Sequence, residues 1–205
     1  MNGSDKDRLG NDQVVKQSEE RAMERRDFLQ TLVGGSLILL VPARLSAQVL
    51  KHGNSVAFRS LGHLRGPRYL DGRTHDGTVG LAPELSKKYS GTKWSVVRAG
   101  EGIIALKCLG LLEGPGRWLD GRTHDGTVGL APHARKPFTG TIWEVVGADE
   151  SNPNIVRLKC RGHAEGPRWL DGRTHDGTVW LAPKTDPPFT GTKWEVQGYP
   201  VRIDE

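Results

Sequence analysis

The sequence predicts an all-β domain built from three copies of one unit, and two observations lead to this fold class. The ten-residue stretch LDGRTHDGTV occurs unchanged at residues 70–79, 119–128 and 170–179. The 205-residue chain also contains 27 glycines and 12 prolines, and its apolar residues come in short bursts between turn signals. Short bursts of this kind are typical of strands rather than helices. A fixed sequence period indicates internal structural repeats.

The segment before the repeats has the order of a bacterial export signal. Arg25 and Arg26 precede an apolar run over residues 31–41, and the small residue Ala47 follows it. A charged region, an apolar region and a small residue in this order are typical of a secretory signal, and the paired arginines resemble a twin-arginine signal. We therefore expect residues 1–47 to be a cleavable signal peptide with a disordered start. Its partner would be the twin-arginine translocation machinery, and the mature protein would be periplasmic or extracellular.

The rest of the chain, residues 48–205, divides into three units of similar length, at about 52–100, 101–150 and 151–205. Each unit has an Arg-aromatic pair before the shared stretch, Leu-Ala-Pro after it and Gly-Thr-x-Trp toward its end. Four short strands are expected in each unit, and twelve in all. In the first unit they are residues 56–61, the Arg-aromatic-Leu-Asp stretch, residues 78–81 and residues 92–97.

Alternation along the predicted strands separates a buried face from an exposed one. It places Val79 with Leu81, and Trp94 with Val96, on the buried face. Between the second and third strands, Asp76-Gly77 is a strong hairpin signal, because glycine accepts positive φ and aspartate caps its own turn. The unit is therefore expected to contain a hairpin with a polar tip.

One unit of this size cannot bury its apolar face alone, but three can close on one another and remove exposed sheet edges. This layout resembles the β-trefoil, as found in ricin-type lectins, fascin-like domains and actinohivin-like lectins. The resemblance covers nearly all of residues 48–205. It implies a β-trefoil of three four-stranded repeats with pseudo-threefold symmetry. A three-bladed array or an open solenoid is the alternative arrangement.

The resemblance also implies a candidate ligand site in each repeat. In ricin-type lectins, an aspartate near the end of the second strand is the sugar-binding acid. A carboxylate accepts hydrogen bonds from neighbouring sugar hydroxyls, and an aromatic ring packs on the C–H face of a sugar. By alternation, an aromatic residue two places before the aspartate lies on the same side of the strand. The candidate ligand-binding residues are Asp71 with Tyr69, Asp120 with Trp118, and Asp171 with Trp169.

The leading function is therefore that of an exported, non-enzymatic binding module for carbohydrate, such as a cell-envelope glycan, with up to three equivalent sites. The alternative is a structural or protein-interaction domain, in which the repeated loop serves folding alone. A glycan-processing enzyme is a third, weaker hypothesis, because no nucleophile motif or phosphate loop is present.

Charge and composition argue against several other classes. The formal net charge is +5, but acids and bases alternate along the chain, and nucleic-acid binding would favour a basic stripe. The repeated histidines His75, His124 and His175 are expected at hairpin tips that lie apart, so no metal site and no cofactor are predicted.

Three further residues are distinctive. The only cysteines, Cys108 and Cys160, occupy matching strand positions and are expected to be buried free thiols, with a disulfide between them as the alternative. Trp180 stands where the other units have glycine, and alternation points it outward. It is either a contact residue or packed against Tyr199.

Overall fold

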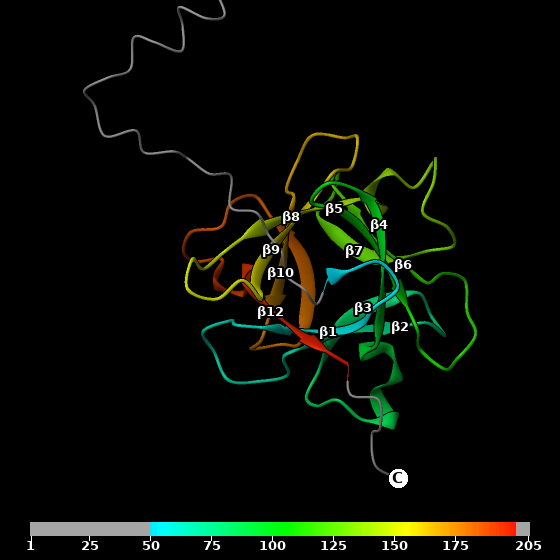
Figure 1. Cartoon of the computed structure of the whole chain (residues 1–205), viewed down its shortest axis with the longest axis horizontal. Helices are drawn as coiled ribbons and strands as arrows, with labels where there is room; N and C mark the ends of the chain where they lie inside the picture. Colours follow the sequence, from blue (N-terminus) through cyan, green and yellow to red (C-terminus); the bar gives the residue numbers. More distant parts are fainter. Residues whose placement is uncertain (1–49, 200–205) are drawn as a thin grey trace, which may run out of the picture. The chain divides into compact units, whose positions relative to one another are not determined.

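The structure, a computed structural model, describes residues 50–199, which form an all-β domain with twelve strands (Figure 1). The first unit contains β1 (Ser55–Ser60), β2 (Tyr69–Arg73), β3 (Thr78–Ala82) and β4 (Trp94–Gly100). The second contains β5 (Ile103–Cys108), β6 (Trp118–Arg122), β7 (Thr127–Ala131) and β8 (Trp143–Gly147). The third contains β9 (Ile155–Cys160), β10 (Trp169–Arg173), β11 (Thr178–Ala182) and β12 (Trp194–Gly198). Short 3-10 helices precede the last strand of each unit: η2 (Lys87–Thr92), η3 (Thr139–Thr141) and η4 (Thr190–Thr192).

The predicted signal peptide, residues 1–47 with Arg25 and Arg26, lies outside the described residues. Within residues 50–199, no helix has the length and apolar character that crossing a membrane requires.

Six of the strands form an unbroken antiparallel ring. β1 pairs with β12 and β4, β5 pairs with β4 and β8, and β9 pairs with β8 and β12. Each of these six strands therefore has a partner on both sides. Closing a sheet in this way removes the free edges that would otherwise invite aggregation.

The predicted β-trefoil of three four-stranded repeats is wrong. All twelve strands belong to one sheet, which closes as an antiparallel β-barrel. β4 pairs over six register positions with β5 of the next unit, but over only two with β1 of its own unit. The first and last strands of each unit have hydrogen-bonding edges that their own unit leaves largely unpaired, and strands of the neighbouring units satisfy them. The sequence repeat is therefore not the unit of strand pairing.

The other six strands form three hairpins: β2–β3, β6–β7 and β10–β11. The second strands of the hairpins, β3, β7 and β11, also pair with one another. Three equivalent backbone bonds of 2.8 Å join them, from Leu81 N to Gly177 O, Leu130 N to Gly77 O and Leu181 N to Gly126 O. The second strands of the three hairpins therefore meet, although the sequence predicts that the hairpin tips lie apart.

The core is centred on three tryptophans, Trp94, Trp143 and Trp194, which are completely buried. Val79, Leu81 and Val96 are also buried, which confirms the face assignment made from alternation. Burying a large aromatic ring removes a large apolar area from water, and the polar N–H of the indole then requires a partner.

Cys108 and Cys160 are buried and free, as expected. Burial raises the pKa of each thiol to about 11. Each sulfur approaches the carbonyl oxygen of a hairpin glycine, at 3.4 Å for Cys108 and Gly72. Ser60 occupies the matching place in the first unit and donates to the carbonyl oxygen of Gly172 at 3.1 Å. The two residue types therefore have the same structural role.

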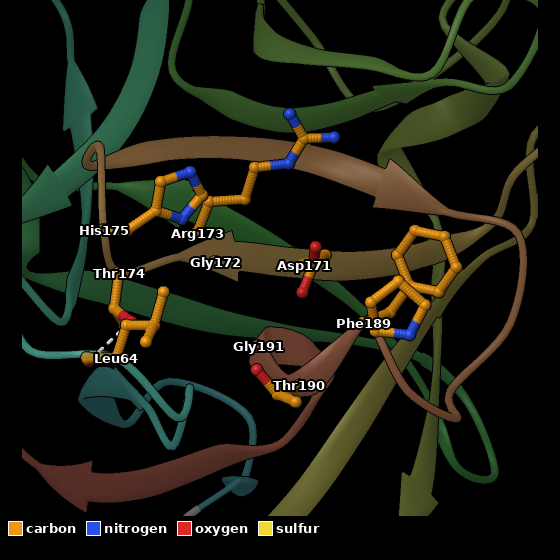
Figure 2. A pocket seen from close by; sticks show the side chains of 10 residues that line it. Leu64, Asp171, Gly172, Arg173, Thr174, His175, Phe189, Thr190 and Gly191 are labelled. Carbon is orange, nitrogen blue, oxygen red and sulfur yellow. Dashed lines mark hydrogen bonds between the residues drawn. The ribbon is translucent and has the colours of Figure 1, made fainter.

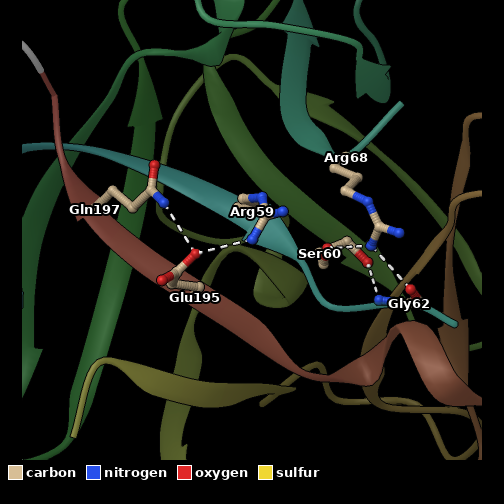
Figure 3. A network of polar contacts seen from close by, with 6 residues as sticks. All are labelled: Arg59, Ser60, Gly62, Arg68, Glu195 and Gln197. Carbon is tan, nitrogen blue, oxygen red and sulfur yellow. Dashed lines mark hydrogen bonds and ion pairs between the residues drawn. The ribbon is translucent and has the colours of Figure 1, made fainter. Parts of the chain in front are cut away.

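The loop after β1 is fixed by an arginine (Figure 3). Arg68 donates to the carbonyl oxygens of Gly62 at 2.8 Å and Leu64 at 3.0 Å. Arg117 and Arg168 hold the corresponding loops in the other units. On the neighbouring strands, Glu195 accepts hydrogen bonds from Arg59 at 3.3 Å and from Gln197 at 2.9 Å. The arginine therefore fixes the shape of this loop.

Candidate functional site

Most of the repeated LDGRTHDGTV stretch serves the fold. In the first unit Leu70 is completely buried, and a Cβ on Gly72 would lie 2.8 Å from Cys108 Sγ. Thr74 Oγ1 donates to the carbonyl oxygen of Leu112 at 2.6 Å. Asp76 Oδ1 accepts hydrogen bonds from both the N–H and the hydroxyl of Thr78, and Gly77 has a φ of 77°. These positions need no ligand to explain why they recur.

Three positions of the same stretch are not explained in this way. They are the first aspartate, the arginine and the histidine, which in the third unit are Asp171, Arg173 and His175. The guanidinium of Arg173 makes no hydrogen bond or ion pair with another residue of the described part of the chain, and it lies over the ring of Trp180 at 5.3 Å. The side chain of His175 is exposed and approaches Asp176 at 3.3 Å. These three positions are therefore the candidates for a functional role.

All three residues line one cavity of about 300 Å³ (Figure 2). In Figure 2, Asp171 lies in the middle of the group, with His175 and Leu64 on one side and Phe189 on the other. The cavity is at the lower end of the size range of small-molecule sites. Its lining is Leu64, Asp171, Gly172, Arg173, Thr174, His175, Pro188, Phe189, Thr190 and Gly191.

Asp171 is a buried polar group of this cavity that lacks a hydrogen-bond partner among the described residues. The residue is only 5% exposed, and its Oδ1 has no hydrogen-bond partner within residues 50–199. Burial raises the pKa of its carboxyl, while Arg173 and the nearby N–H of Gly191, which does not reach good hydrogen-bond geometry at Oδ1, oppose the rise. A buried carboxylate that lacks a partner is rare in native proteins and calls for an explanation.

The aromatic wall of the cavity is Phe189, which the sequence analysis did not single out. The predicted aromatic partner, Trp169, is half-buried on β10, is not part of the lining and lies under the ammonium of Lys159 at 5.5 Å. Trp118 has the same relation to Lys107, and Tyr69 is half-buried at the matching place. The cavity therefore combines the predicted aspartate with a different aromatic residue.

A sequence signal for Phe189 did exist. An aromatic residue stands five places before the last tryptophan in every unit, as Tyr89, Phe138 and Phe189. Tyr89 lies within η2, and Phe138 and Phe189 directly precede η3 and η4. These short helices contact β2, β6 and β10, the strands that carry the aspartates.

Each site is made by two units. In the third unit Thr174 Oγ1 donates to the carbonyl oxygen of Leu64 at 2.7 Å, and the N–H of His63 donates to Thr190 Oγ1 at 3.3 Å. Leu64 and His63 belong to the loop of the first unit. The arginine-held loop of one unit thus forms a wall against the hairpin of another.

The same construction is found at the other two places. Thr123 donates to the carbonyl oxygen of Ala164 at 2.8 Å, and the N–H of His163 donates to Thr139 Oγ1 at 3.1 Å. Thr74 reaches Leu112 in the same way, and the N–H of Leu111 donates to Ser90 Oγ at 3.1 Å. Three similar sites are therefore arranged around one end of the barrel.

Asp71 and Asp120 resemble Asp171 in their surroundings. Both are 7% exposed, and burial raises the pKa of each carboxyl. Arg73 beside Asp71 and Arg122 beside Asp120 oppose the rise. In each unit, the backbone glycine of the Gly-Thr-x-Trp motif also lies close to the carboxylate.

Within residues 50–199, no group of three or more histidine, cysteine or acidic side chains has the arrangement of a metal site. The side chains that line the cavity of the third unit offer one carboxylate, one guanidinium, one imidazole, hydroxyl groups and an aromatic ring.

Comparison with known proteins places the fold and no more. No family model and no curated protein sequence matches the chain. Among solved structures, a GlcNAcα1-4Gal-releasing endo-β-galactosidase from Clostridium perfringens is similar over 71% of this chain, with a TM-score of 0.53 and 16% identity. The match spans only 32% of that enzyme's length. A salivary protein from Culex quiquefasciatus of the Cysteine and Tryptophan-Rich family matches 71% of this chain and 94% of its own, with a TM-score of 0.49 and 14% identity.

Proposed function

We propose that this protein is a non-enzymatic carbohydrate-binding module with three related pockets, each of which accepts one sugar ring. The observation that carries the proposal is Asp171: a nearly buried carboxylate that lacks a hydrogen-bond partner lines an open cavity beside an aromatic ring. A carboxylate that lines a cavity can accept hydrogen bonds there, and the hydroxyl groups of a sugar are donors for it.

The remaining lining residues fit the same ligand class. Phe189 offers a ring face for the C–H surface of a sugar. The guanidinium of Arg173 and the hydroxyl of Thr190 offer donors for ring and hydroxyl oxygens. A mixed set of one carboxylate, one guanidinium, one imidazole and neutral hydroxyls favours a neutral polyhydroxyl ligand over a strongly charged one.

Binding is favoured over glycoside hydrolysis by the number of acids. Hydrolysis of a glycosidic bond generally needs two carboxyl groups on either side of the bond, about 5–9.5 Å apart. Asp171 is the one acidic residue in the cavity lining. The neighbouring Asp176 is exposed and already accepts two hydrogen bonds from Thr178. Three similar weak pockets instead suit multivalent attachment to a repetitive glycan surface.

The proposed export of the chain gives this binding a setting. A module delivered by the twin-arginine pathway to the periplasm or beyond would meet cell-envelope or extracellular glycans. The likeness to part of an endo-β-galactosidase is compatible with a glycan-handling role, but at 16% identity it adds only the fold.

The test is a binding assay with residues 48–205 against a panel of neutral glycans and peptidoglycan fragments. A triple variant, Asp71→Asn with Asp120→Asn and Asp171→Asn, should lose binding while keeping its circular dichroism spectrum. Asp149→Asn is the matched control, because Asp149 is an exposed acid in the loop after β8 and bonds only locally, to Ser151. Equal binding by the wild type and the triple variant would refute the proposal.

A protein-contact function is the second candidate, and the exposed leucines favour it. Leu111 is 75% exposed, Leu112 58% and Leu64 52%, all on the arginine-held loops. Isolated exposed leucines are common, but Leu111 and Leu112 adjoin one another. This candidate predicts that Leu111→Ser with Leu112→Ser abolishes a purified partner's binding while glycan binding, if any, is unaffected.

A further inference from the structure

We infer that the pocket of the third unit continues onto Trp180, so that this site binds at least two consecutive sugar rings, whereas the pockets of the first and second units end after one. This inference rests on the proposed carbohydrate function.

Trp180 lies next to the pocket on the same face of its hairpin. It stands directly opposite Asp171 in the pairing of β10 with β11. Side chains directly opposite in an antiparallel pair lie on one face, with Cβ atoms about 4.5–5.5 Å apart. The indole is 36% exposed, although tryptophan is usually well buried. An exposed ring therefore lies beside the acid of the pocket.

Arg173 connects the two. Its side chain lines the cavity, and its guanidinium carbon lies 5.3 Å from the centre of the Trp180 ring. Stacking on the indole holds the guanidinium in one place, while its N–H groups, which have no acceptor among the described residues, are directed to the surroundings. A sugar bound in the pocket and a second ring on the indole would both be within reach of these donors.

The other units do not have this platform. Gly80 and Gly129 occupy the positions that match Trp180. A Cβ on Gly80 would lie 2.8 Å from Nη2 of Arg73, and a Cβ on Gly129 would lie 3.5 Å from Nη2 of Arg122. In the first unit the guanidinium of Arg73 therefore occupies the space that a side chain at this position would fill, whereas in the second unit Arg122 only borders that space. The pocket wall ends there in an arginine rather than in an aromatic surface.

The chemistry of the extended site follows from these residues. The carboxylate and Phe189 would hold the first ring of a neutral oligosaccharide in the cavity. The exposed indole would pack on the C–H face of the next ring, as aromatic side chains pack on apolar surfaces. The third site should therefore prefer chains over single sugars, which the other two should not.

The experiment isolates the third pocket with the background variant Asp71→Asn with Asp120→Asn. Calorimetric titration would use two series of probes, N-acetylglucosamine with its β-1,4-linked oligomers and galactose with its β-1,4-linked oligomers, each from one to four units. In this background the affinity should rise from the monomer to the dimer. Adding Trp180→Gly, the residue found in the other units at this place, should lower dimer affinity by about tenfold and so remove the rise, with a much smaller effect on the monomer, which keeps Asp171 and Phe189.

A gain-of-function variant provides the matched control. Gly129→Trp is the better site for it, because a Cβ there meets no heavy atom closer than 3.3 Å. In a background that retains only the second pocket (Asp71→Asn with Asp171→Asn), Gly129→Trp should create a preference for the dimer. Amide and indole spectra would check the same point: a monomer should shift Gly191 N–H, and a dimer should also shift the indole N–H of Trp180.

Results that overturn the carbohydrate proposal differ from results that overturn only the extension onto Trp180. If no member of either series binds the wild type, the carbohydrate proposal and this inference both fall. If sugars bind through Asp171 but Trp180→Gly weakens monomer and dimer equally, or neither, the carbohydrate proposal stands and the extension onto Trp180 is overturned.

Discussion

The indole of Trp194 donates a hydrogen bond from Nε1 to the carbonyl oxygen of Leu170 at 3.0 Å, from the barrel core to the hairpin strand β10. Trp143 makes the same bond to Leu119 at 3.0 Å, and Trp94 to Leu70 at 2.9 Å. The acceptor immediately precedes the pocket aspartate in each unit. The most buried ring of each unit thus fixes the backbone on which the candidate site is built.

We expect Trp194→Phe to destabilise the domain by about 2–4 kcal/mol, because it leaves a buried carbonyl without a donor and removes buried volume. Urea unfolding followed by circular dichroism would measure this. The exposed Trp180, changed to Phe in the same way, should alter the free energy of unfolding by less than about 0.5 kcal/mol. Similar losses in both variants would contradict the structural role assigned to the indole bond.

Asp171→Asn should stabilise the protein at neutral pH. Burial raises the pKa of the folded-state carboxyl above the ordinary value of 3.8, so the folded protein binds this proton more readily than the unfolded chain. The carboxyl therefore favours folding most below its unfolded pKa, and this contribution is lost as pH rises through the raised folded pKa. The advantage of the amide should be present at pH 7, as a gain of about 2–4 °C in Tm for roughly 1 kcal/mol, and disappear below pH 4. A constant difference across this range would argue against the raised pKa.

Asp176→Ala should show the opposite pH dependence. Hydrogen bonds from the N–H and hydroxyl of Thr178 lower the pKa of this exposed carboxyl below 3.8. Its ionised form therefore stabilises the fold above the unfolded pKa, and that contribution is lost as pH falls through the lowered folded pKa. The variant should melt below the wild type at pH 7, and the gap should narrow toward pH 2. Thermal melts of Asp171→Asn and Asp176→Ala on the same pH series would test both signs together.

The two thiols should be inert in the folded protein. Cys108 and Cys160 are completely buried, and burial raises the pKa of each to about 11, so little thiolate exists at pH 8. A thiol reagent should modify neither at a measurable rate in buffer and both in denaturant. Ser60→Cys places a third thiol at the matching position and should be equally protected. Rapid labelling of any of the three would mean that the strand ends open.

The sequence predicted best those features that depend on one residue and its immediate neighbours in the chain. Alternation located Trp94, Val96 and Val79 in the core, and Asp76-Gly77 marked the hairpin turn. The pairing of β4 with β5 could not be predicted in this way. It depends on which strand edges are left free when three units meet, and that is a property of the closed sheet rather than of one unit.

The same distinction applies to the candidate site: its local motif could be predicted, and its residues from distant segments could not. Asp171 was a candidate because its place, after the core leucine at the end of the second strand, resembles that of the sugar-binding acid in ricin-type lectins. Phe189 and Leu64 were not, because they come from other segments. Phe189 reaches the cavity because η4 packs on β10, and Leu64 because the loop of the first unit packs on the hairpin of the third. Trp169 was paired with Asp171 by strand alternation alone, but the Asp171 cavity is instead lined by Phe189.

The pairing of β1 with β12 has a consequence for how the chain can be cut and rejoined. The first and last strands of the barrel are neighbours in this pairing. In addition, Leu64, a wall residue of the third pocket, belongs to the first unit. A circular permutant that joins the old ends by a short linker and opens the loop between β8 and β9 would keep every wall with its hairpin. Deleting a whole unit would leave at least one hairpin without the loop that completes its pocket. The number of complete sites therefore depends on closure of the strand ring as well as on the number of repeats.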